Sequence, residues 1–519
     1  MSTKLFSYAV LLTWLTQACG DGKPNDGSAG DADAPASVAA GAAAGGSGGT
    51  GGAASLDGSA SDGTPSTADA GTASDSDGAV AGGGDATASN TGGDASTASE
   101  PSEVRAFPGA EGFGAMVTGG RGGAILRVTT LEPTGPGSLQ EALNTPGPRI
   151  IVFTVSGVID GPLFEIPHGD LTIAGQTAPG GGITIGGRLY GAYDYDVGNM
   201  IIRHVRIRPE YDGSDVAQFD GIQFSRNHHL IFDHVSVSGG VDETVDLYES
   251  KDVSFQWSTV AFSHLENGHN YGLINGPDGA RVSVHHSLFA HHLNRTPAIA
   301  NGPAEMINLV DYNVRHGFVH HNPASGPFNL VGNYFKDGGD DTIFPFFFDD
   351  TDLEGLSYYL EDNFVEGADS DCGDGYITDA WAQCENLDAL ESQRAQALHD
   401  FTGQGDSYRP VTVDDVQDAY AAVLARAGAF PRDVVTTTAV SDVEAGSGSW
   451  GHFYPVDLMA GLTPAAPPTD ADEDGMADDW ELQQGLDPSD GSDHASVMPS
   501  GYTAIEDYVN GLADALVAP

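Results

Sequence analysis

Three carboxylates stand close together in the most regular part of the chain, in the stretch SVSGGVDETVDLYES. Val245 and Leu247 alternate there with polar neighbours, which is typical of a half-buried β-strand. The same stretch holds Asp242, Glu243 and Asp246, although strands favour apolar or neutral residues. This gathering of carboxylates points to cation chemistry, with solvated turn acids as the alternative.

A hard-cation site needs these oxygens closer together than a straight strand would place them. Asp242 and Asp246 would share one face of the strand but lie ~13 Å apart, at ~3.3 Å per residue. Calcium binds oxygen ligands at about 2.3–2.6 Å, so one ion could not contact both. We therefore expect a bend between them, aided by Gly239 and Gly240 just upstream. Asp220, about one repeat earlier, would supply a third carboxylate.

A second candidate is Arg295, in the stretch AHHLNRTPAIA. The chain has only 20 Lys and Arg residues, and the neighbours of Arg295 are mostly apolar or histidine, with no acid among them. The strand-like run VSVHHSLFA precedes it, so we expect Arg295 to emerge where a strand ends. A surface arginine paired with a distant acid is the alternative.

The stretch DADEDGMADDWE, residues 470–481, carries a different acid pattern. It has acids at positions 1, 3 and 5, glycine at position 6 and glutamate at position 12, which is the spacing of an EF-hand calcium loop. The pattern predicts calcium binding and says nothing about catalysis. The expected ligands are Asp470, Asp472, Asp474, the carbonyl of Met476, Asp478 and Glu481.

The elements that must position these residues are short β-type runs that recur along the chain. They include MIIRHVRIR, LIFDHVSVS, VSFQWSTVA, VSVHHSLFA and INLVDYNVR. Aligning these runs places His204, His234, Trp257, His286 and Asp311 in one column. A repeat of about 25 residues with strand-type alternation indicates a solenoid whose rungs stack on one another. No helix separates the strands, as a doubly wound fold would require, so we predict an all-β, right-handed parallel β-helix.

The composition and the N-terminus indicate an exported protein. The formal net charge of −54 over 519 residues argues against nucleic acid as a partner, because phosphate binding needs clustered basic residues. Lys4 precedes an apolar run, LFSYAVLLTWL, that is too short to span a bilayer. The following LTQACG resembles a lipoprotein cleavage site that would leave Cys19 lipidated at the bacterial outer membrane or cell surface. Secretion after ordinary signal cleavage is the alternative.

The rest of the chain divides by composition. A stretch rich in Gly, Ala, Ser and Asp cannot bury enough apolar surface to fold and reads as a tether. Cys372 and Cys384 form an even pair and predict a disulfide in an oxidising compartment. The run VDDVQDAYAAVLARAGAF predicts a helix in a C-terminal extension. The expected domains are a signal peptide (1–19), the linker (20–103), the β-helix (104–340), the extension (341–466) and an EF-hand-like module (467–519).

From about residue 107 to 338 the sequence resembles bacterial pectate lyases of polysaccharide lyase family 1. The matching motifs include AFPGAEGFGAMVTGGRGG, IIVFTVSGVID, LTIAGQTAPGGGI, NMIIRHVRIRP, IFDHVSVSGGVDE, VSVHHSLFAHHLNRTP and NLVGNYFKDG. The resemblance implies a parallel β-helix that cleaves polygalacturonate or pectin by β-elimination. It implies that Asp220, Asp242 and Asp246 hold Ca²⁺, that Arg295 removes the proton at C5, and that His269 binds substrate.

Departures from the family pattern leave other functions open. The family often has a second arginine after RTP, whereas this chain reads RTPAIAN, and Leu247 rather than lysine follows Asp246. Fewer basic residues would weaken the grip on polygalacturonate. The expected function is a monomeric, calcium-dependent pectate lyase whose only membrane contact is its lipid anchor. The alternatives are a polygalacturonase-type hydrolase on the same fold, which would need paired acids about a glycosidic bond, and a non-catalytic polysaccharide-binding protein.

Overall fold

The computed structural model describes residues 104–518 apart from four short segments, 194–196, 214–218, 267 and 349–354. The described residues belong to one compact unit, Asp94–Pro519. Cys19, the signal segment and the linker lie outside the described residues, so what the sequence predicts for them stays a prediction. Within the described part, no helix has both the length and the apolar character that crossing a membrane would take.

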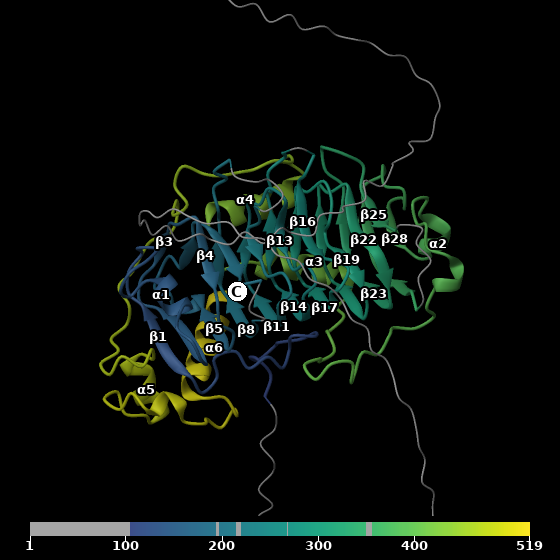
Figure 1. Cartoon of the computed structure of the whole chain (residues 1–519). Coiled ribbons are helices and arrows are strands. Elements are labelled where there is room, and N and C mark those ends of the chain that lie inside the picture. The colour runs from purple at the N-terminus through teal and green to yellow at the C-terminus, as the bar shows by residue number, and fades with distance from the viewer. Residues whose placement is uncertain (1–103, 194–196, 214–218, 267, 349–354, 519) are drawn as a thin grey trace, which may run out of the picture. The chain divides into compact units, whose positions relative to one another are not determined.

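The chain winds into a solenoid of three sheets, called here sheet 1, sheet 2 and sheet 3 (Figure 1). Sheet 1 is the ladder β1 (Ala124–Val128), β2 (Arg149–Phe153), β5 (Leu171–Ala174), β8 (Gly198–Arg203), β11 (His228–Asp233), β14 (Lys251–Gln256), β17 (Ala280–His285), β20 (Ala304–Ile307), β23 (Pro327–Val331) and β26 (Ser357–Glu361). Each of its neighbouring pairs is parallel, which confirms the predicted parallel β-helix.

The two other sheets follow the same winding. Sheet 2 is the ladder β4 (Leu163–Ile166), β7 (Arg188–Gly191), β10 (Ile222–Gln223), β13 (Glu243–Asp246), β16 (Tyr271–Asn275), β19 (Ala298–Asn301), β22 (His316–Ser325) and β25 (Phe344–Phe347). Sheet 3 is the ladder β3 (Gly157–Ile159), β6 (Ile183–Ile185), β9 (Val205–Ile207), β12 (Ser236–Val237), β15 (Thr259–Ala261), β18 (Leu288–Ala290), β21 (Val310–Tyr312), β24 (Tyr334–Lys336), β27 (Asn363–Glu366) and β28 (Gly375–Ile377). The strands therefore continue past the boundary expected at residue 340, and only the last described pair, β27–β28, is antiparallel.

The interior of the solenoid is a continuous apolar core, because parallel pairing places like residues above one another in successive rungs. Leu230, Val253 and Val282 occupy equivalent positions on β11, β14 and β17 and are all buried. Phe232 and Phe255 form a neighbouring column with ring centroids 5.8 Å apart. Each rung covers the apolar face of the next, so the burial that stabilises the fold is shared between rungs.

A column of residues with left-handed backbone turns the chain from sheet 1 to sheet 3. His204, His234, Trp257 and His286 each have a positive φ near 50°, and their rings stack, as the repeat predicted. The fifth predicted member is wrong: His285 pairs with Ile307, so Asn308 continues the column. The apolar alternation of INLVDYNVR suggested a strand starting at residue 307, where β20 in fact ends, and Asp311 is instead buried on β21.

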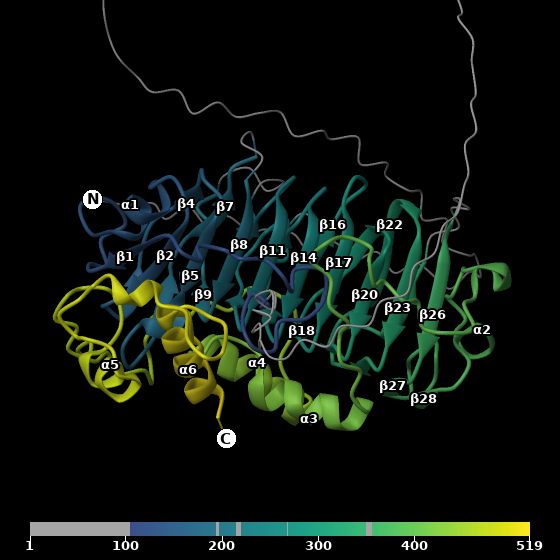
Figure 2. The same ribbon diagram turned by 90° about the horizontal axis from the view of Figure 1, so that it is seen from below.

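Helices cover the outer faces of two sheets (Figure 2). Helices α3 (Val416–Arg426) and α4 (Val434–Ala445) pack their apolar side chains on sheet 3, and Asp415 caps α3, the helix that the sequence predicted. Helices α5 (Asp478–Gln484) and α6 (Ala504–Val517) lie by the first strands of sheet 1. The remaining helices are short: α1 (Leu139–Leu143), α2 (Ala380–Gln383), η1 (Gly175–Thr177), η3 (Glu391–Gln393) and η4 (Asp493–Ala495). The predicted disulfide joins Cys372 and Cys384.

The aromatic column in the core generates a stability prediction. Phe255 is fully buried beneath Phe232, so Phe255→Ala should lower the free energy of unfolding by about 3–5 kcal/mol through lost burial and the cavity left behind. Urea-induced unfolding followed by circular dichroism measures the change. Leu265→Ala is the control, because that side chain is 54% exposed, and an equal loss in both variants would contradict the stacked core.

Candidate metal and catalytic site

Four of the predicted site residues stand at one edge of sheet 2. Asp220 comes just before β10, Asp242 just before β13, His269 just before β16 and Arg295 shortly before β19. These four strands are consecutive neighbours in the sheet. Because successive rungs stack in register, residues that enter neighbouring strands come together although they are far apart in sequence. All four lie in the turns that lead from sheet 3 to sheet 2.

The carboxylates of Asp220, Asp242 and Glu243 each place an oxygen within 4.8 Å of the others. An oxygen of Asp220 also accepts a hydrogen bond from the backbone N–H of Glu243 at 2.9 Å, which fixes the two rungs relative to each other. The chain turns at Gly239, whose φ is +83°. The expected bend between Asp242 and Asp246 is absent, since Glu243–Asp246 is the regular strand β13.

Asp246, the third predicted ligand, stands beside this group, and its role in holding a cation stays a prediction. The Asp246 carboxylate accepts hydrogen bonds from the Ser225 hydroxyl at 3.0 Å, the Gln223 amide at 3.3 Å and the Tyr248 backbone N–H at 2.6 Å. Burial, and to a smaller extent the charge of Asp242, raise the pKa of Asp246 to about 6. Asp246 therefore adds to the negative field of the site while its own oxygens are engaged by neighbours.

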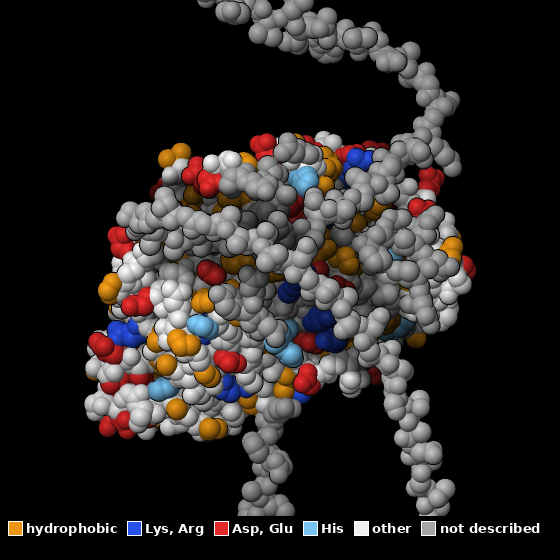
Figure 3. Space-filling view, viewed as in Figure 1, with side chains coloured by type: hydrophobic (Ala, Val, Ile, Leu, Met, Phe, Trp, Pro, Cys, Tyr) orange, Lys and Arg blue, Asp and Glu red, His pale blue; other side chains and the backbone are white. Residues whose placement is uncertain are grey.

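Burial makes this group of acids electrostatically costly. Burial first, and then repulsion from Asp246, Glu243 and Asp242, raise the pKa of Asp220 well above its ordinary value. The pKa of Glu243 rises to about 8, chiefly through burial. These acids differ from the Asp and Glu side chains that Figure 3 shows scattered over the visible surface, where water screens the charge. A buried all-carboxylate group of this kind needs compensating positive charge.

Two side chains supply part of that charge. Arg295 makes an ion pair with Glu243, and its guanidinium lies 4.3 Å from the centre of the Tyr271 ring. A ring nitrogen of His269 lies 2.6 Å from an oxygen of Asp242. The sequence left open that Arg295 pairs with a distant acid. It does pair with one, Glu243, but this acid belongs to the carboxylate group of the site. Only 15% of the Arg295 side chain is exposed.

Sequence reasoning left out three contributors to the site. Glu243 belongs to the gathering of acids in the sequence but is not among the three expected calcium ligands, although its place beside Asp242 is a usable signal. Arg188 donates to the backbone carbonyl of Asp220 at 3.1 Å from the preceding rung. Tyr271 supplies the ring that supports Arg295. Nothing in the local sequence marks Arg188 or Tyr271, because their roles depend on which rungs become neighbours.

The donor set fits calcium. The converging oxygens of Asp220, Asp242 and Glu243 are hard carboxylate ligands, which suit Ca²⁺ better than the softer metals that favour nitrogen or sulfur. Their mutual repulsion would be relieved by a divalent cation. His269 and Arg295 stand at the rim of the carboxylate group, so a cation and a basic side chain would lie next to each other.

The predicted C-terminal loop also brings its acids together. Asp470, Asp472 and Asp474 form one group of carboxylates within 4.8 Å, and Asp474, Glu481 and Asp493 form a second. One expected ligand, Asp478, lies outside both groups, and the expected role of the Met476 carbonyl stays a prediction. The Asp478 carboxylate accepts a hydrogen bond from the Ala471 N–H at 2.8 Å. The side chain of Met476 is buried in an apolar cluster.

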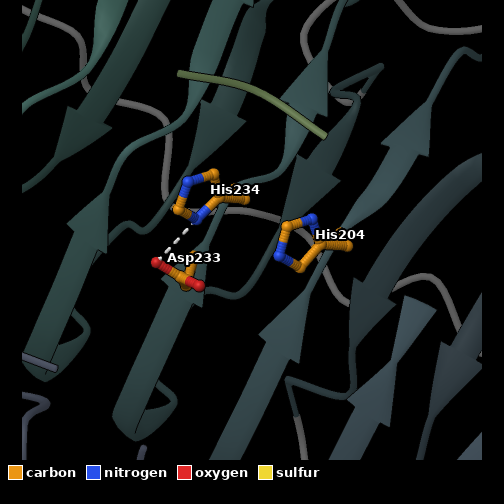
Figure 4. Close-up of side chains that lie close together, drawn as sticks. All are labelled: His204, Asp233 and His234. Atoms are coloured by element: carbon orange, nitrogen blue, oxygen red, sulfur yellow. Dashed lines mark ion pairs between the residues drawn. The ribbon is translucent and has the colours of Figure 1, made fainter. Parts of the chain in front are cut away.

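A third polar group, His204, Asp233 and His234, lies at the corner between sheet 1 and sheet 3 (Figure 4). The Asp233 carboxylate lies 3.0 Å from His234, and Arg203 also pairs with it at 2.8 Å. The two imidazoles stack with an angle of 10° between their planes. Stacked rings direct their lone pairs along parallel planes and not toward one point, so this arrangement suits the structural column better than a metal ion. Burial, followed by the charge of His234, lowers the pKa of His204 well below its ordinary value.

Curated relatives identify the family. The chain is 34% identical over 419 residues to the protein named "Probable pectate lyase C" of Aspergillus flavus, covering 79% of this chain and 94% of the relative. The protein of the same name from Aspergillus fumigatus is 32% identical over 415 residues, covering 78% and 93%. A "Pectate trisaccharide-lyase" of Thermotoga maritima is 28% identical over 207 residues, 37% of this chain and 51% of that protein. No family model matches the chain.

Solved structures similar to this chain include proteins named as pectate lyases. The thermostable pectate lyase PL 47 is 16% identical with a TM-score of 0.43, covering 62% of this chain and 97% of that one. A pectate lyase from Bacillus sp. N165 in complex with trigalacturonate is 14% identical with a TM-score of 0.41, covering 61% and 98%. At these scores the likeness carries no weight for individual residues.

Fold, site and sequence relatives together define a polysaccharide lyase built on a parallel β-helix. The chain belongs to the pectate lyase family. The long matches are to fungal proteins, so the bacterial subgroup expected from the motifs stays a prediction.

The raised pKa of Glu243 predicts how metal-free stability depends on pH. Glu243 holds its proton up to about pH 8 when folded but only to about 4.5 when unfolded, so its contribution to stability falls as the pH rises through that window. With a chelator present, Glu243→Gln should have a higher melting temperature than the parent. This difference should grow as the pH rises from about 4.5 to about 8. Glu444→Gln, an exposed position, is the control and should leave the difference constant. A constant difference for Glu243→Gln as well would show that this carboxylate is not the strained group.

Proposed function

We propose that the protein is a calcium-dependent pectate lyase that cleaves polygalacturonate by β-elimination and releases 4,5-unsaturated oligogalacturonides. The observation that carries the proposal is the contact of the Arg295 guanidinium with a carboxylate group built from Asp220, Asp242 and Glu243. Membership of the pectate lyase family supports it. Within the family, we propose the bacterial branch of polysaccharide lyase family 1, on the motifs that run from about residue 107 to 338.

The carboxylates would bind and orient the ion together with the substrate acid group. Calcium would be held by the three predicted ligands, Asp220, Asp242 and Asp246, and would supply positive charge beside the C6 carboxylate of a uronate and so acidify its C5 proton. Glu243 would add a fourth carboxylate to the three predicted ones. The buried surroundings strengthen the electrostatic effect, because little water is present to screen it.

Arg295 would remove the C5 proton. The electrons of the C5–H bond become the C4–C5 double bond, the C4–O bond breaks, and the leaving oxygen takes a proton from water. An ordinary arginine stays protonated at neutral pH, and neighbouring positive charge favours the neutral form that the reaction needs. The turn before β19, together with Tyr271, holds the guanidinium at the carboxylate group.

His269 would bind the substrate at the rim of the site. Its ring contacts Asp242 and lies 4.8 Å from the Tyr271 ring, and its side chain is partly exposed beside the carboxylates. Arg188, on the neighbouring rung, is a second basic group close to the acids. Because few basic residues lie near the site, we expect modest affinity for an acidic plant-type polysaccharide. We expect the protein to be a monomer.

The segments before residue 104 and after residue 340 would serve export and stability. We take residues 1–19 as a lipoprotein-type signal ending at Cys19 and residues 20–103 as a tether that keeps the enzyme at the bacterial surface, or secreted if cleavage is ordinary. Residues 341–466 would extend the solenoid with the disulfide and helices. Residues 467–519 would form an EF-hand-like module that binds a second calcium ion through Asp470, Asp472, Asp474 and Glu481.

Activity on polygalacturonate gives the central test. Arg295→Ala should reduce kcat by about 10²–10⁴-fold, as expected for loss of the group that moves a proton, and calcium removal should abolish activity. The ultraviolet absorbance of the unsaturated product measures turnover. Arg281→Ala is the matched control, because that arginine pairs with Asp252 at 2.6 Å on sheet 1, away from sheet 2.

Other results would replace the proposal. New reducing ends without ultraviolet absorbance, and without a calcium requirement, would indicate a hydrolase. Measurable binding of polygalacturonate with no product of either kind would indicate a non-catalytic polysaccharide-binding protein. Full activity of Arg295→Ala would remove Arg295 from the chemistry while leaving the family assignment in place.

The proposed anchor has its own test. In a bacterial host that processes lipoproteins, Cys19→Ser should move the protein from the membrane fraction to the soluble fraction, because no acyl chains remain to hold it. Immunoblotting of separated fractions measures the shift, and Ser7→Ala serves as a control within the same segment. An unchanged distribution would show that an ordinary signal, and not a lipid, governs the location.

A further inference from the structure

The C-terminal calcium loop has a neighbour that its sequence pattern does not include. Asp474 and Glu481 of the loop share a carboxylate group with Asp493, which lies beyond α5 in a return segment. Asp474 is also a member of the group formed with Asp470 and Asp472. Two segments of chain therefore deliver five carboxylates to one place.

These carboxylates contain buried oxygens that no protein group satisfies. Glu481 is 0% exposed, and neither of its carboxylate oxygens has a hydrogen-bond partner. Buried oxygens without hydrogen-bond partners also occur on Asp470, Asp472, Asp474 and Asp493. Buried charged oxygens are costly unless they are paired, and so many facing one another point to a bound cation.

Asp493 is held in an orientation that leaves one oxygen for a ligand. Its Oδ2 accepts a hydrogen bond from the Asp487 backbone N–H at 2.9 Å, while its Oδ1 is buried without a partner. The return segment also lies against the loop, because a Cβ added at Gly491 would come within 3.3 Å of the Asp472 carbonyl oxygen. The backbone thus aims Asp493 at the carboxylate group.

Asp478, the expected ligand at position 9 of the loop, makes hydrogen bonds within the loop instead. Its Oδ1 accepts the Ala471 N–H at 2.8 Å, and its own N–H donates to the Thr469 carbonyl at 3.0 Å. These two bonds close the loop on itself at the start of α5. Asp478 belongs to none of the carboxylate groups formed by the described residues.

We propose that Asp493 is a direct ligand of the C-terminal Ca²⁺ and replaces Asp478, so that the ion fastens the return segment to the loop. The inference rests on the calcium loop proposed above. Oxygen ligands from acidic side chains are what Ca²⁺ prefers, and its flexible coordination of six to eight oxygens accommodates a ligand from outside the loop.

The same ion would couple the module to the first rungs of the solenoid. Met476, in the middle of the loop, is buried against Ile150 and Val152 of β2 and against Ile505 of α6. Arg127 of β1 makes an ion pair with Glu473 of the loop at 3.2 Å. Ordering the loop around Ca²⁺ therefore stabilises a contact with sheet 1, at a distance from the edge of sheet 2 that carries the proposed chemistry.

Calorimetric titration of the full chain with Ca²⁺ tests the ligand, with Asp493→Asn as the variant. Asparagine keeps an oxygen to accept the Asp487 N–H but loses the charge, so calcium affinity at the C-terminal site should fall at least about tenfold. The calcium-induced rise in melting temperature should shrink accordingly. Lyase activity at saturating calcium should stay unchanged. Asp478→Asn is the matched control and should retain the parent affinity.

Glu481→Gln distinguishes failure of this inference from failure of the calcium loop. If Glu481→Gln abolishes the second binding event while Asp493→Asn binds as the parent does, Asp493 is not a ligand and the loop proposal stands. If both variants bind as the parent does, both proposals are overturned. A melting temperature in chelator equal to that of the parent verifies folding, and Asp493→Ser serves if Asp493→Asn does not fold.

Discussion

The in-register stacking of one rung on the next is the constraint on which the rest of the structure depends. Parallel pairing in three sheets places equivalent residues of successive rungs over one another, and this alone builds the core columns such as Phe232 over Phe255. The same stacking gathers Asp220, Asp242, His269 and Arg295 from four rungs at one edge of sheet 2. In-register stacking of the rungs therefore builds both the apolar core inside the solenoid and the group of polar residues where the strands of sheet 2 begin.

Burying several carboxylates together in the proposed site costs free energy, and the burial of the apolar core opposes that cost. Burying Asp220, Glu243 and Asp246 next to one another is costly, and the raised pKa values of these carboxyl groups express that cost. The continuous apolar interior of the solenoid contributes burial that opposes this cost. Carboxylates kept close and poorly solvated are prepared to bind a cation, and Arg295 and His269 hold them in place meanwhile.

The sequence predicted what local pattern determines and missed what depends on rung register. The alternation and the repeat predicted the β-helix and four members of its corner column, but Asp311 was aligned in place of Asn308 because apolar alternation does not mark where β20 ends. Resemblance to a family pointed to Arg295 and His269, whereas Arg188 joins the site only because its rung lies next to that of Asp220. Glu243 follows Asp242 directly but was not among the expected ligands. Asp493 was absent from the loop pattern because it comes from a separate segment.

The corner between sheet 1 and sheet 3 has a consequence for how such a protein can diversify. Every rung from β8 to β27 makes this corner in one or two residues, whereas the turns that lead from sheet 3 to sheet 2 differ widely in length. A fixed short corner keeps the register from rung to rung, so insertions and deletions in the longer turns leave the stack undisturbed. The longer turns also carry Asp220, Asp242, His269 and Arg295. Changes in these turns can therefore alter substrate preference while the stacked strands stay the same.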